Sequence, residues 1–173
     1  EYIKKLWEYA IKKLEISKKR NVKRILVLGV AGGTIIHLLH AMYPKAKITG
    51  VDIDSVMIEI GKKYFGLRDM KNVTLIVADA KDFILHRKNN IYDVVVIDLF
   101  IGREIPRFIE RYDFWERITA MLTPRGFVFI NYLKELEHGD KPSGMTKTLH
   151  RVFPIVARVD YEYNRFFLAK KSL

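Results

Sequence analysis

A strand-turn-helix pattern near the N-terminus constrains this chain more than any other feature. An apolar, β-branched run leads into a turn of small residues that contains Gly29, Ala31 and Gly33. A second strand over residues 47–52 ends in Asp52. Such a turn places a helix N-terminus beside a ligand, and the acid can accept hydrogen bonds from ribose hydroxyls. Glycine-rich turns also serve plain strand-to-helix packing, but the paired acid favours a nucleoside site.

Two further apolar runs deliver an aspartate to the end of a strand. The first covers residues 73–78 and precedes Asp79, and the second ends in Asp98. Continuous apolar runs fit strands that are buried on both faces of a parallel sheet, and such sheets bind ligands beyond the carboxyl ends of their strands. Aspartates can instead cap the helix that follows. We expect this capping role for Asp54 and Asp82, and a ligand-binding role for the strand-terminal acids.

Apolar periodicity predicts strands that alternate with helices. The strands are predicted at residues 24–28, 47–52, 73–78, 93–98, 127–132, 155–161 and 165–170, and the helices at 2–16, 33–42, 54–64, 80–88, 112–122 and near 143–152. This alternation predicts an α/β fold with a Rossmann-like, doubly wound, mostly parallel seven-stranded sheet. A short asparagine-containing turn predicts a final hairpin, whose last strand is antiparallel. Residues 123–126 are expected to connect a helix to the fifth strand.

These motifs resemble class I S-adenosylmethionine-dependent methyltransferases, and within that fold the spermidine synthase-like group. The resemblance covers residues 22–168. It implies that Asp52 binds both ribose hydroxyls and that Asp79 with Ala80 contacts the adenine edge. Asp98 would lie beside the reactive sulfonium. The implied cofactor-binding residues are Gly29, Ala31, Gly33, Asp52, Ile53, Asp79, Ala80 and Asp98.

The chain departs from spermidine synthases at several positions. Those enzymes usually carry a second acid shortly after the fourth strand, whereas residues 99–102 here are Leu, Phe, Ile and Gly. Gly32 stands where they usually have aspartate, and one helix stands in place of an N-terminal β-hairpin domain. We therefore expect methyl transfer from S-adenosylmethionine to a small acceptor. Aminopropyl transfer from decarboxylated S-adenosylmethionine is the alternative.

The acceptor side of the site is predicted from fewer residues. Asp98 is the expected catalytic base or acceptor-orienting group, although it could instead bind the methionine amine of the cofactor. His138 is a minor candidate for the base. The loop after the fourth strand is the expected substrate rim, with Arg103, Arg107 and Tyr112. Its basic character suits an anionic or aromatic acceptor better than a diamine, because a buried polycation needs carboxylate partners.

Composition indicates one domain over residues 1–173, with a basic amphipathic helix over 1–20 and a catalytic core over 22–173. The 173 residues are 49% apolar and carry a formal charge of +11. This charge attracts anions, so a non-catalytic module that binds nucleosides or nucleic acid is a third alternative. We favour a solvated basic face, because Trp7 falls on the apolar stripe of the first helix.

Several classes of site are not expected. The absence of cysteine excludes disulfides, thiolate catalysis and cysteine-based zinc sites. His37 and His40 have a spacing that could bind metal, but no third ligand is near them in sequence, so no metal is expected. The sequence also has no apolar run of the ~20 residues that a spanning helix needs. We expect a soluble, cytoplasmic protein, and a homodimer stays open.

Overall fold

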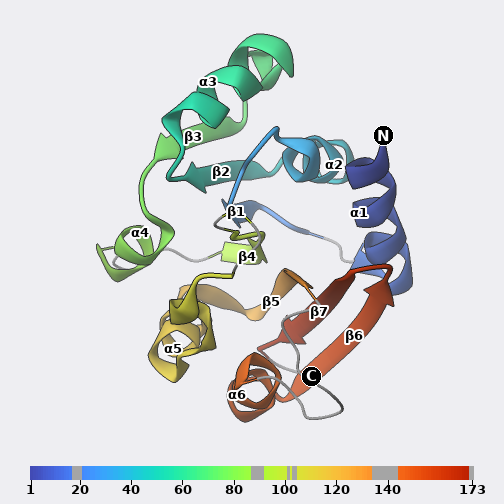
Figure 1. Ribbon diagram of the computed structural model, residues 1–173, viewed down its shortest axis with the longest axis vertical. Coiled ribbons are helices and arrows are strands. Elements are labelled where there is room, and N and C mark those ends of the chain that lie inside the picture. Colours follow the sequence, from blue (N-terminus) through green and yellow to red (C-terminus); the bar gives the residue numbers. More distant parts are fainter. Residues whose placement is uncertain (17–20, 87–91, 101, 103–104, 134–143, 172–173) are drawn as a thin grey trace.

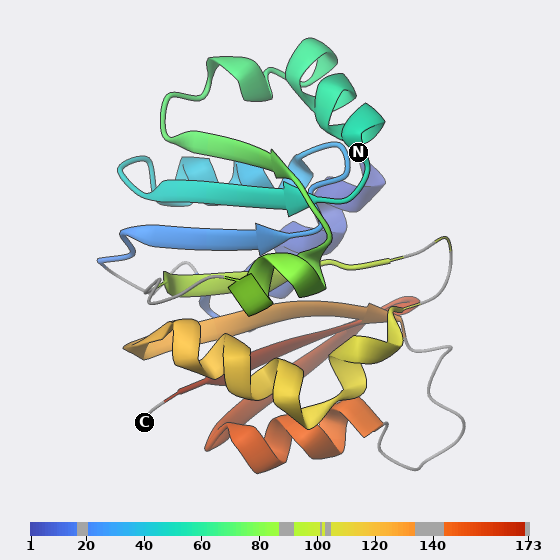
Figure 2. The ribbon, with the colours of Figure 1, turned by 90° about the vertical axis from the view of Figure 1, so that its left-hand side faces the viewer.

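The computed structural model describes residues 1–16, 21–86, 92–100, 102, 105–133 and 144–171. It contains a seven-stranded sheet in the order β3-β2-β1-β4-β5-β7-β6 (Figures 1 and 2). The strands are β1 (Arg24–Leu28), β2 (Lys47–Asp52), β3 (Val73–Val77), β4 (Tyr92–Ile97), β5 (Leu122–Leu133), β6 (Ile155–Tyr161) and β7 (Asn164–Lys170). Strands β3, β2, β1, β4 and β5 pair in parallel, whereas β7 is antiparallel to both β5 and β6. The predicted doubly wound sheet and its antiparallel last strand are confirmed.

Helices cover both faces of this sheet (Figure 1). One face carries α1 (Tyr2–Lys13), α2 (Thr34–Met42) and α3 (Ser55–Tyr64), and the other carries α4 (Ala80–His86), α5 (Tyr112–Met121) and α6 (Gly144–Val152). Two short 3₁₀ helices, η2 (Leu67–Asp69) and η3 (Arg107–Glu110), lie in the connections. The predicted helices therefore all have a counterpart, with ends that coincide with the prediction or differ from it by at most three residues.

Strand β1 shows why the central strands are apolar along their whole length. Ile25 and Val27 pack into the core beside α1 and α2, whereas Leu26 and Leu28 pack into the core beside α4 and α5. Successive side chains of a strand point to opposite faces, so a central strand with helices on both faces buries every residue. The buried runs that suggested a parallel sheet follow from this two-sided packing.

Helix α1 presents its apolar stripe to the sheet. The ring of Trp7 is 1% exposed and meets the rings of Phe129 and Phe166 edge-on, at centroid distances of 5.1 and 5.2 Å. Tyr9 packs against Tyr161 on β6, with centroids 4.7 Å apart. The lysines of α1 remain exposed on the opposite side. These contacts agree with the solvated basic face expected for the first helix.

The start of β5 differs from the prediction. Residues 123–126 do not form a separate connection, because β5 begins at Leu122 directly after α5. The register shifts there, so that four residues of β5 lie opposite Asp93 alone. Asp93 accepts hydrogen bonds from the backbone N–H groups of Lys23 and Arg24 and from the Thr123 hydroxyl. A strand irregularity of this kind tolerates the proline that suggested a loop.

The closing hairpin also differs in detail. Its two turn residues are Glu162, with φ of 50°, and Tyr163, while Asn164 already belongs to β7. The Tyr2 hydroxyl donates a 2.7 Å hydrogen bond to the Glu162 carboxylate, which ties α1 to this turn. Within the described parts of the chain, no helix is long and apolar enough to cross a membrane.

Candidate active site

The carboxyl ends of β1, β2 and β4 lie side by side at one edge of the sheet (Figure 2). Leu28 pairs with Val51 on one side and with Ile97 on the other, so the residues that follow these strands also become neighbours. The Gly29 N–H donates to the Val51 carbonyl and the Asp98 N–H to the Leu28 carbonyl, each at 2.8 Å. The sheet register therefore brings the glycine turn, Asp52 and Asp98 together.

The turn after β1 requires small residues for two reasons. Gly29 has φ of 88°, and a Cβ atom there would overlap the backbone carbonyl of Asp98. Gly33 has φ of 82° and forms the N-cap of α2, where a Cβ would lie 2.6 Å from the Leu67 side chain. Ala31 adopts φ of 44° and bears a Cβ in a left-handed conformation that favours glycine. Gly33 packs against Leu67, and the cavities described below do not include it.

Asp52 holds this turn in place. Its Oδ2 accepts hydrogen bonds from the N–H groups of Val30 and Ala31, at 2.7 and 2.9 Å, and its Oδ1 accepts one from Asp54 at 2.9 Å. Sequence reasoning did not foresee this role. An ionised carboxylate has about four acceptor positions. Asp52 can therefore bind the turn and still accept a further donor.

Asp79 is both a cavity residue and a helix cap. Its Oδ1 accepts a 2.7 Å hydrogen bond from the Lys81 N–H at the start of α4. The capping role expected for Asp82 is wrong, because Asp82 lies inside the first turn of that helix. The same expectation is confirmed for Asp54, whose carboxylate accepts from the N–H groups of Val56 and Met57 at the start of α3.

Asp98 is the most perturbed acid of the site. Withdrawal from water raises the pKa of its carboxyl group from 3.8 to about 6, and the negative charge of Asp52 adds to the shift. A hydrogen bond from Asn131 Nδ2, 2.9 Å from Oδ1, opposes it by favouring the charged form. A carboxyl group with this pKa can exchange a proton near neutral pH.

Two adjoining cavities meet at Asp98. The first, which we call the carboxylate cavity, has a volume of about 410 Å³. It is lined by predicted cofactor-binding residues, namely Gly29, Ala31, Asp52, Ile53, Asp79, Ala80 and Asp98. The second, the α1 cavity, has a volume of about 500 Å³ and lies between α1 and the sheet. Ala31, Asp98, Phe100 and Gly102 line both.

The α1 cavity contains residues that sequence reasoning missed. Ile3, Leu6 and Trp7 form its helical wall, and Asn131 and Asn164 contribute amides from β5 and β7. The signal for Asn131 was a lone polar residue inside the apolar run of β5. A residue of α1, in contrast, shows no sequence sign that it faces a ligand, because core residues have the same periodicity.

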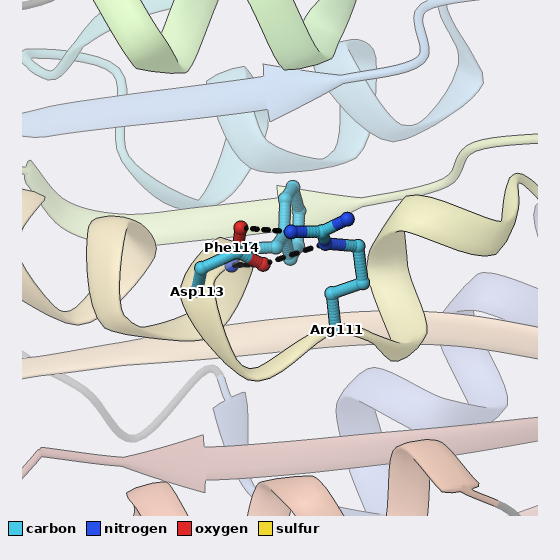
Figure 3. Close-up of polar contacts among 3 residues, drawn as sticks. All are labelled: Arg111, Asp113 and Phe114. Atoms are coloured by element: carbon cyan, nitrogen blue, oxygen red, sulfur yellow. Dashed lines mark hydrogen bonds and ion pairs between the residues drawn. The ribbon is translucent and has the colours of Figure 1, made fainter.

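Of the predicted rim residues, Arg107 and Tyr112 line neither cavity. Arg107 is exposed, and Tyr112 lies beneath the guanidinium of Arg151 at 4.6 Å. Figure 3 shows Arg111 paired side-on with Asp113, with two hydrogen bonds of 2.7 and 2.9 Å. This pairing raises the pKa of Arg111 and lowers that of Asp113. Pro106 and Phe108 of this segment line the carboxylate cavity.

The remaining candidates either lie outside the described residues or line neither cavity. Arg103, Ile101 and His138 lie outside the described residues. His37 Nε2 lies 2.6 Å from the Phe65 carbonyl oxygen, in a contact that is exposed. Among the residues that the structure describes, no three histidine or acidic side chains are grouped so that they could hold a metal ion.

Known proteins are similar to this chain in both sequence and structure. A family model described as "Methyltransferase domain" matches residues 19–157. The eEF1A lysine and N-terminal methyltransferase homolog of Drosophila melanogaster is 30% identical over 83% of the chain and 22% of its own length. The polyamine aminopropyltransferase of Vibrio vulnificus is 29% identical over 63% of the chain and 37% of its own length. The chain thus spans less than two fifths of the length of each of these relatives.

A solved structure shares the fold. Human Methyltransferase-like protein 13, solved in complex with SAH, superposes with a TM-score of 0.76 at 24% identity. The match covers 86% of this chain and 72% of that one.

Proposed function

The chain belongs to the methyltransferase domain family, whose model matches residues 19–157, and from that membership we propose that it transfers a methyl group from S-adenosylmethionine to a small acceptor. One observation carries the proposal. The glycine turn and three strand-terminal carboxylates line one cavity. Asp98, the acid among them whose pKa is raised to about 6, also lines the α1 cavity. Donor and acceptor could therefore meet at one side chain.

The carboxylate cavity suits an adenosine group. Asp52 and Asp79 can accept hydrogen bonds from ribose hydroxyls and from an adenine amino group, respectively. Gly29 keeps the turn free of a side chain where the backbone comes closest to β4. A volume of about 410 Å³ is within the range of small-molecule sites. The SAH bound in the human structure supports a cofactor of this chemistry.

The reaction requires little chemistry from the protein. S-adenosylmethionine supplies a methyl carbon that its cationic sulfur already makes electrophilic. The chain must hold donor and acceptor in line and remove a proton where the acceptor carries one. Asp52 and the turn would position the donor, and ionised Asp98 would orient the acceptor and accept its proton.

The α1 cavity favours an aromatic or aliphatic acceptor over an anionic one. Ile3, Leu6, Trp7 and Phe100 are apolar, and Asp98 is the only charged lining residue within the described part of the chain. An anionic acceptor would meet this carboxylate without a cation, which is costly in a cavity withdrawn from water. We therefore propose a neutral or amine-bearing acceptor, in place of the anionic class that the basic rim suggested.

A product assay tests the function. Wild-type protein given methyl-labelled S-adenosylmethionine should methylate members of a panel of aromatic and aliphatic amines and phenols, whereas matched carboxylates should give background counts. The same protein given putrescine and decarboxylated S-adenosylmethionine should form no spermidine. Robust spermidine formation would make aminopropyl transfer the function, and a silent panel with no donor binding would contradict the enzyme proposal.

Loss of Asp52 should weaken cofactor binding strongly. Asp52→Ala removes an acceptor for the ribose and also three hydrogen bonds that hold the turn. We expect calorimetry with S-adenosylhomocysteine to show a loss of ~2–4 kcal/mol, because one hydrogen bond to a charged group contributes about 1.5–3 kcal/mol and the turn is loosened as well. The control is Asp69→Ala, which removes an exposed acid in η2 and should bind S-adenosylhomocysteine like wild type. Unchanged affinity in folded Asp52→Ala would remove this residue from the site.

Aminopropyl transfer is kept as a second candidate because the Vibrio relative bears that name. The carboxylate in an otherwise apolar cavity is compatible with a cationic diamine, but the described lining offers one acid for two ammonium groups.

The alternative of a module that binds nucleosides or nucleic acid rests on the net charge of +11. It predicts target-dependent nucleic-acid binding at near-physiological salt. Cytoplasmic location and oligomeric state stay predictions.

A further inference from the structure

Two side-chain amides link Asp98 to the end of the β6–β7 hairpin. Asn131 Nδ2 lies 2.9 Å from Asp98 Oδ1, and Asn164 Nδ2 lies 2.8 Å from Asn131 Oδ1. Asn131 is 7% exposed, and both asparagines line the α1 cavity. In an otherwise apolar stretch of β5, this buried amide is the exception. A buried polar group is costly unless its hydrogen bonds are satisfied, as these are.

The carboxylate determines which way both amides point. An ionised carboxylate can only accept hydrogen bonds, so Asn131 must turn its NH₂ group toward Asp98 and its carbonyl oxygen toward Asn164. Asn164 must then donate. Oδ1 of Asp98 is thereby occupied, whereas Oδ2 has no hydrogen-bond partner within the described part of the chain. Oδ2 is therefore the oxygen that is more open to proton exchange.

The sheet holds this arrangement rigidly. Leu133 pairs with Asn164 and Asn131 pairs with Phe166 across the antiparallel β5–β7 ladder. The two asparagines are therefore diagonal neighbours on one face of the sheet, close enough for their amides to meet. The turn that precedes β7 is tied to α1 through the Tyr2–Glu162 hydrogen bond.

We propose that Asn131, braced by Asn164, is a positioning residue that keeps Oδ1 of Asp98 occupied and presents Oδ2 to the proton of the acceptor. The O–H bond forms at Oδ2 as the N–H or O–H bond of the acceptor breaks. This inference rests on the proposed transfer function. It goes beyond it by assigning a role to two residues that do not react themselves.

The surroundings leave Asn131 as the main group that favours the charged form. Among the described residues, the charge placed against Asp98 is that of Asp52 at the end of β2, which disfavours ionisation. Helix α1 contributes Ile3, Leu6 and Trp7 to the shared cavity, and the segment after β4 contributes Phe100. These groups do not titrate, so the balance at Asp98 depends on the amide hydrogen bond.

Asn131→Leu tests the proposal through the pH dependence of the rate. Removing the hydrogen bond raises the pKa of Asp98, so the acidic limb of the pH–rate profile should move upward by about one pH unit. The rate should then fall about tenfold at pH 5 and about twofold at pH 7, while the KM for the donor changes little. In an Asp98→Asn background, the same substitution should have no effect on the profile.

A second measurement does not need transfer activity. The carbon-13 chemical shift of the Asp98 carboxyl group, followed by NMR in the unliganded protein, should titrate about one pH unit higher in Asn131→Leu. Asn164→Ala should raise the titration midpoint of Asp98 by a smaller amount. If Asn131→Leu does not fold, Asn164→Ala takes its place in the test. The matched control is Asn72→Ala, which removes a distant amide that donates to the Pro44 carbonyl. It should leave the titration of Asp98 unchanged.

The outcomes separate this inference from the transfer function. An unchanged Asp98 titration in both variants would overturn the positioning role, even where the variants unfold more easily. If the pKa of Asp98 rises in the variants but the wild-type protein transfers no methyl group, the amide pair controls the pKa of Asp98. The assignment of that control to methyl transfer would then be overturned. A raised titration with the predicted rate change supports both.

Discussion

Asp98→Asn should abolish most of the transfer activity and make the folded protein more stable at neutral pH. The activity should fall by about 10²–10⁴-fold, the usual contribution of a general base. Stability should rise because the pKa of Asp98 is about 6 in the fold against 3.8 unperturbed. Above pH 6 the folded protein must keep a carboxylate charged where ionisation is disfavoured, and an amide removes that cost.

The sign of the pH dependence follows from the same shift. The folded state binds the Asp98 proton more tightly than the unfolded chain, so this group lowers stability as pH rises from about 4 to about 6. We expect Asp98→Asn to gain about 1–3 kcal/mol at pH 7.5 and little at pH 4. Urea unfolding at both pH values measures this gain, and single-turnover rates measure the loss of activity.

Asp93→Asn is the matched control because it changes the same residue type at the opposite end of β4. Asp93 accepts three hydrogen bonds that join β1 and β5 to this strand. Its loss should destabilise the protein by about 1–3 kcal/mol and leave the transfer rate close to wild type. An Asp98→Asn variant that keeps full activity, or that is less stable than wild type at pH 7.5, would contradict the assignment of Asp98.

Gly29→Ala should disrupt both the fold and cofactor binding. The added Cβ would overlap the backbone carbonyl of Asp98, and φ of 88° is strained for any side chain. Because the neighbouring atom is backbone, relief requires β1 and β4 to separate at the edge where the site is built. We expect a loss of about 3 kcal/mol or more in the free energy of unfolding.

Gly66→Ala separates the cost of a left-handed backbone from the cost of the close approach to β4. Gly66 has φ of 68°, but a Cβ there would meet nothing within 4 Å. This variant should lose about 1–2 kcal/mol from the left-handed backbone alone and should bind S-adenosylhomocysteine like wild type. Thermal unfolding and calorimetry on both variants measure the difference. Equal losses would show that close approach of β4 does not constrain Gly29.

Local pattern alone was sufficient for much of the fold. Apolar runs mark the strands because the central sheet is covered by helices on both faces, and the stripe of α1 marks its buried side. The start of β5 was missed because proline and glycine punctuate a sequence in the same way at a loop and at an irregular strand. The pairing of these residues with β4 around Asp93 decides between a loop and an irregular strand, and that pairing is a non-local contact.

The sequence by itself determined which acidic groups and which turn meet in the carboxylate cavity. Gly29, Asp52, Asp79 and Asp98 stand at the ends of consecutive strands, and parallel pairing brings such ends to one edge whatever else the chain does. Only the tertiary structure decided the α1 cavity, where we propose that the acceptor binds. Contacts between α1, β5 and β7 form the α1 cavity, and they join residues more than a hundred positions apart, such as Trp7 and Phe129. Sequence spacing carries no record of those contacts, which arise when the hairpin joins the edge of the sheet and α1 packs on the face of that sheet.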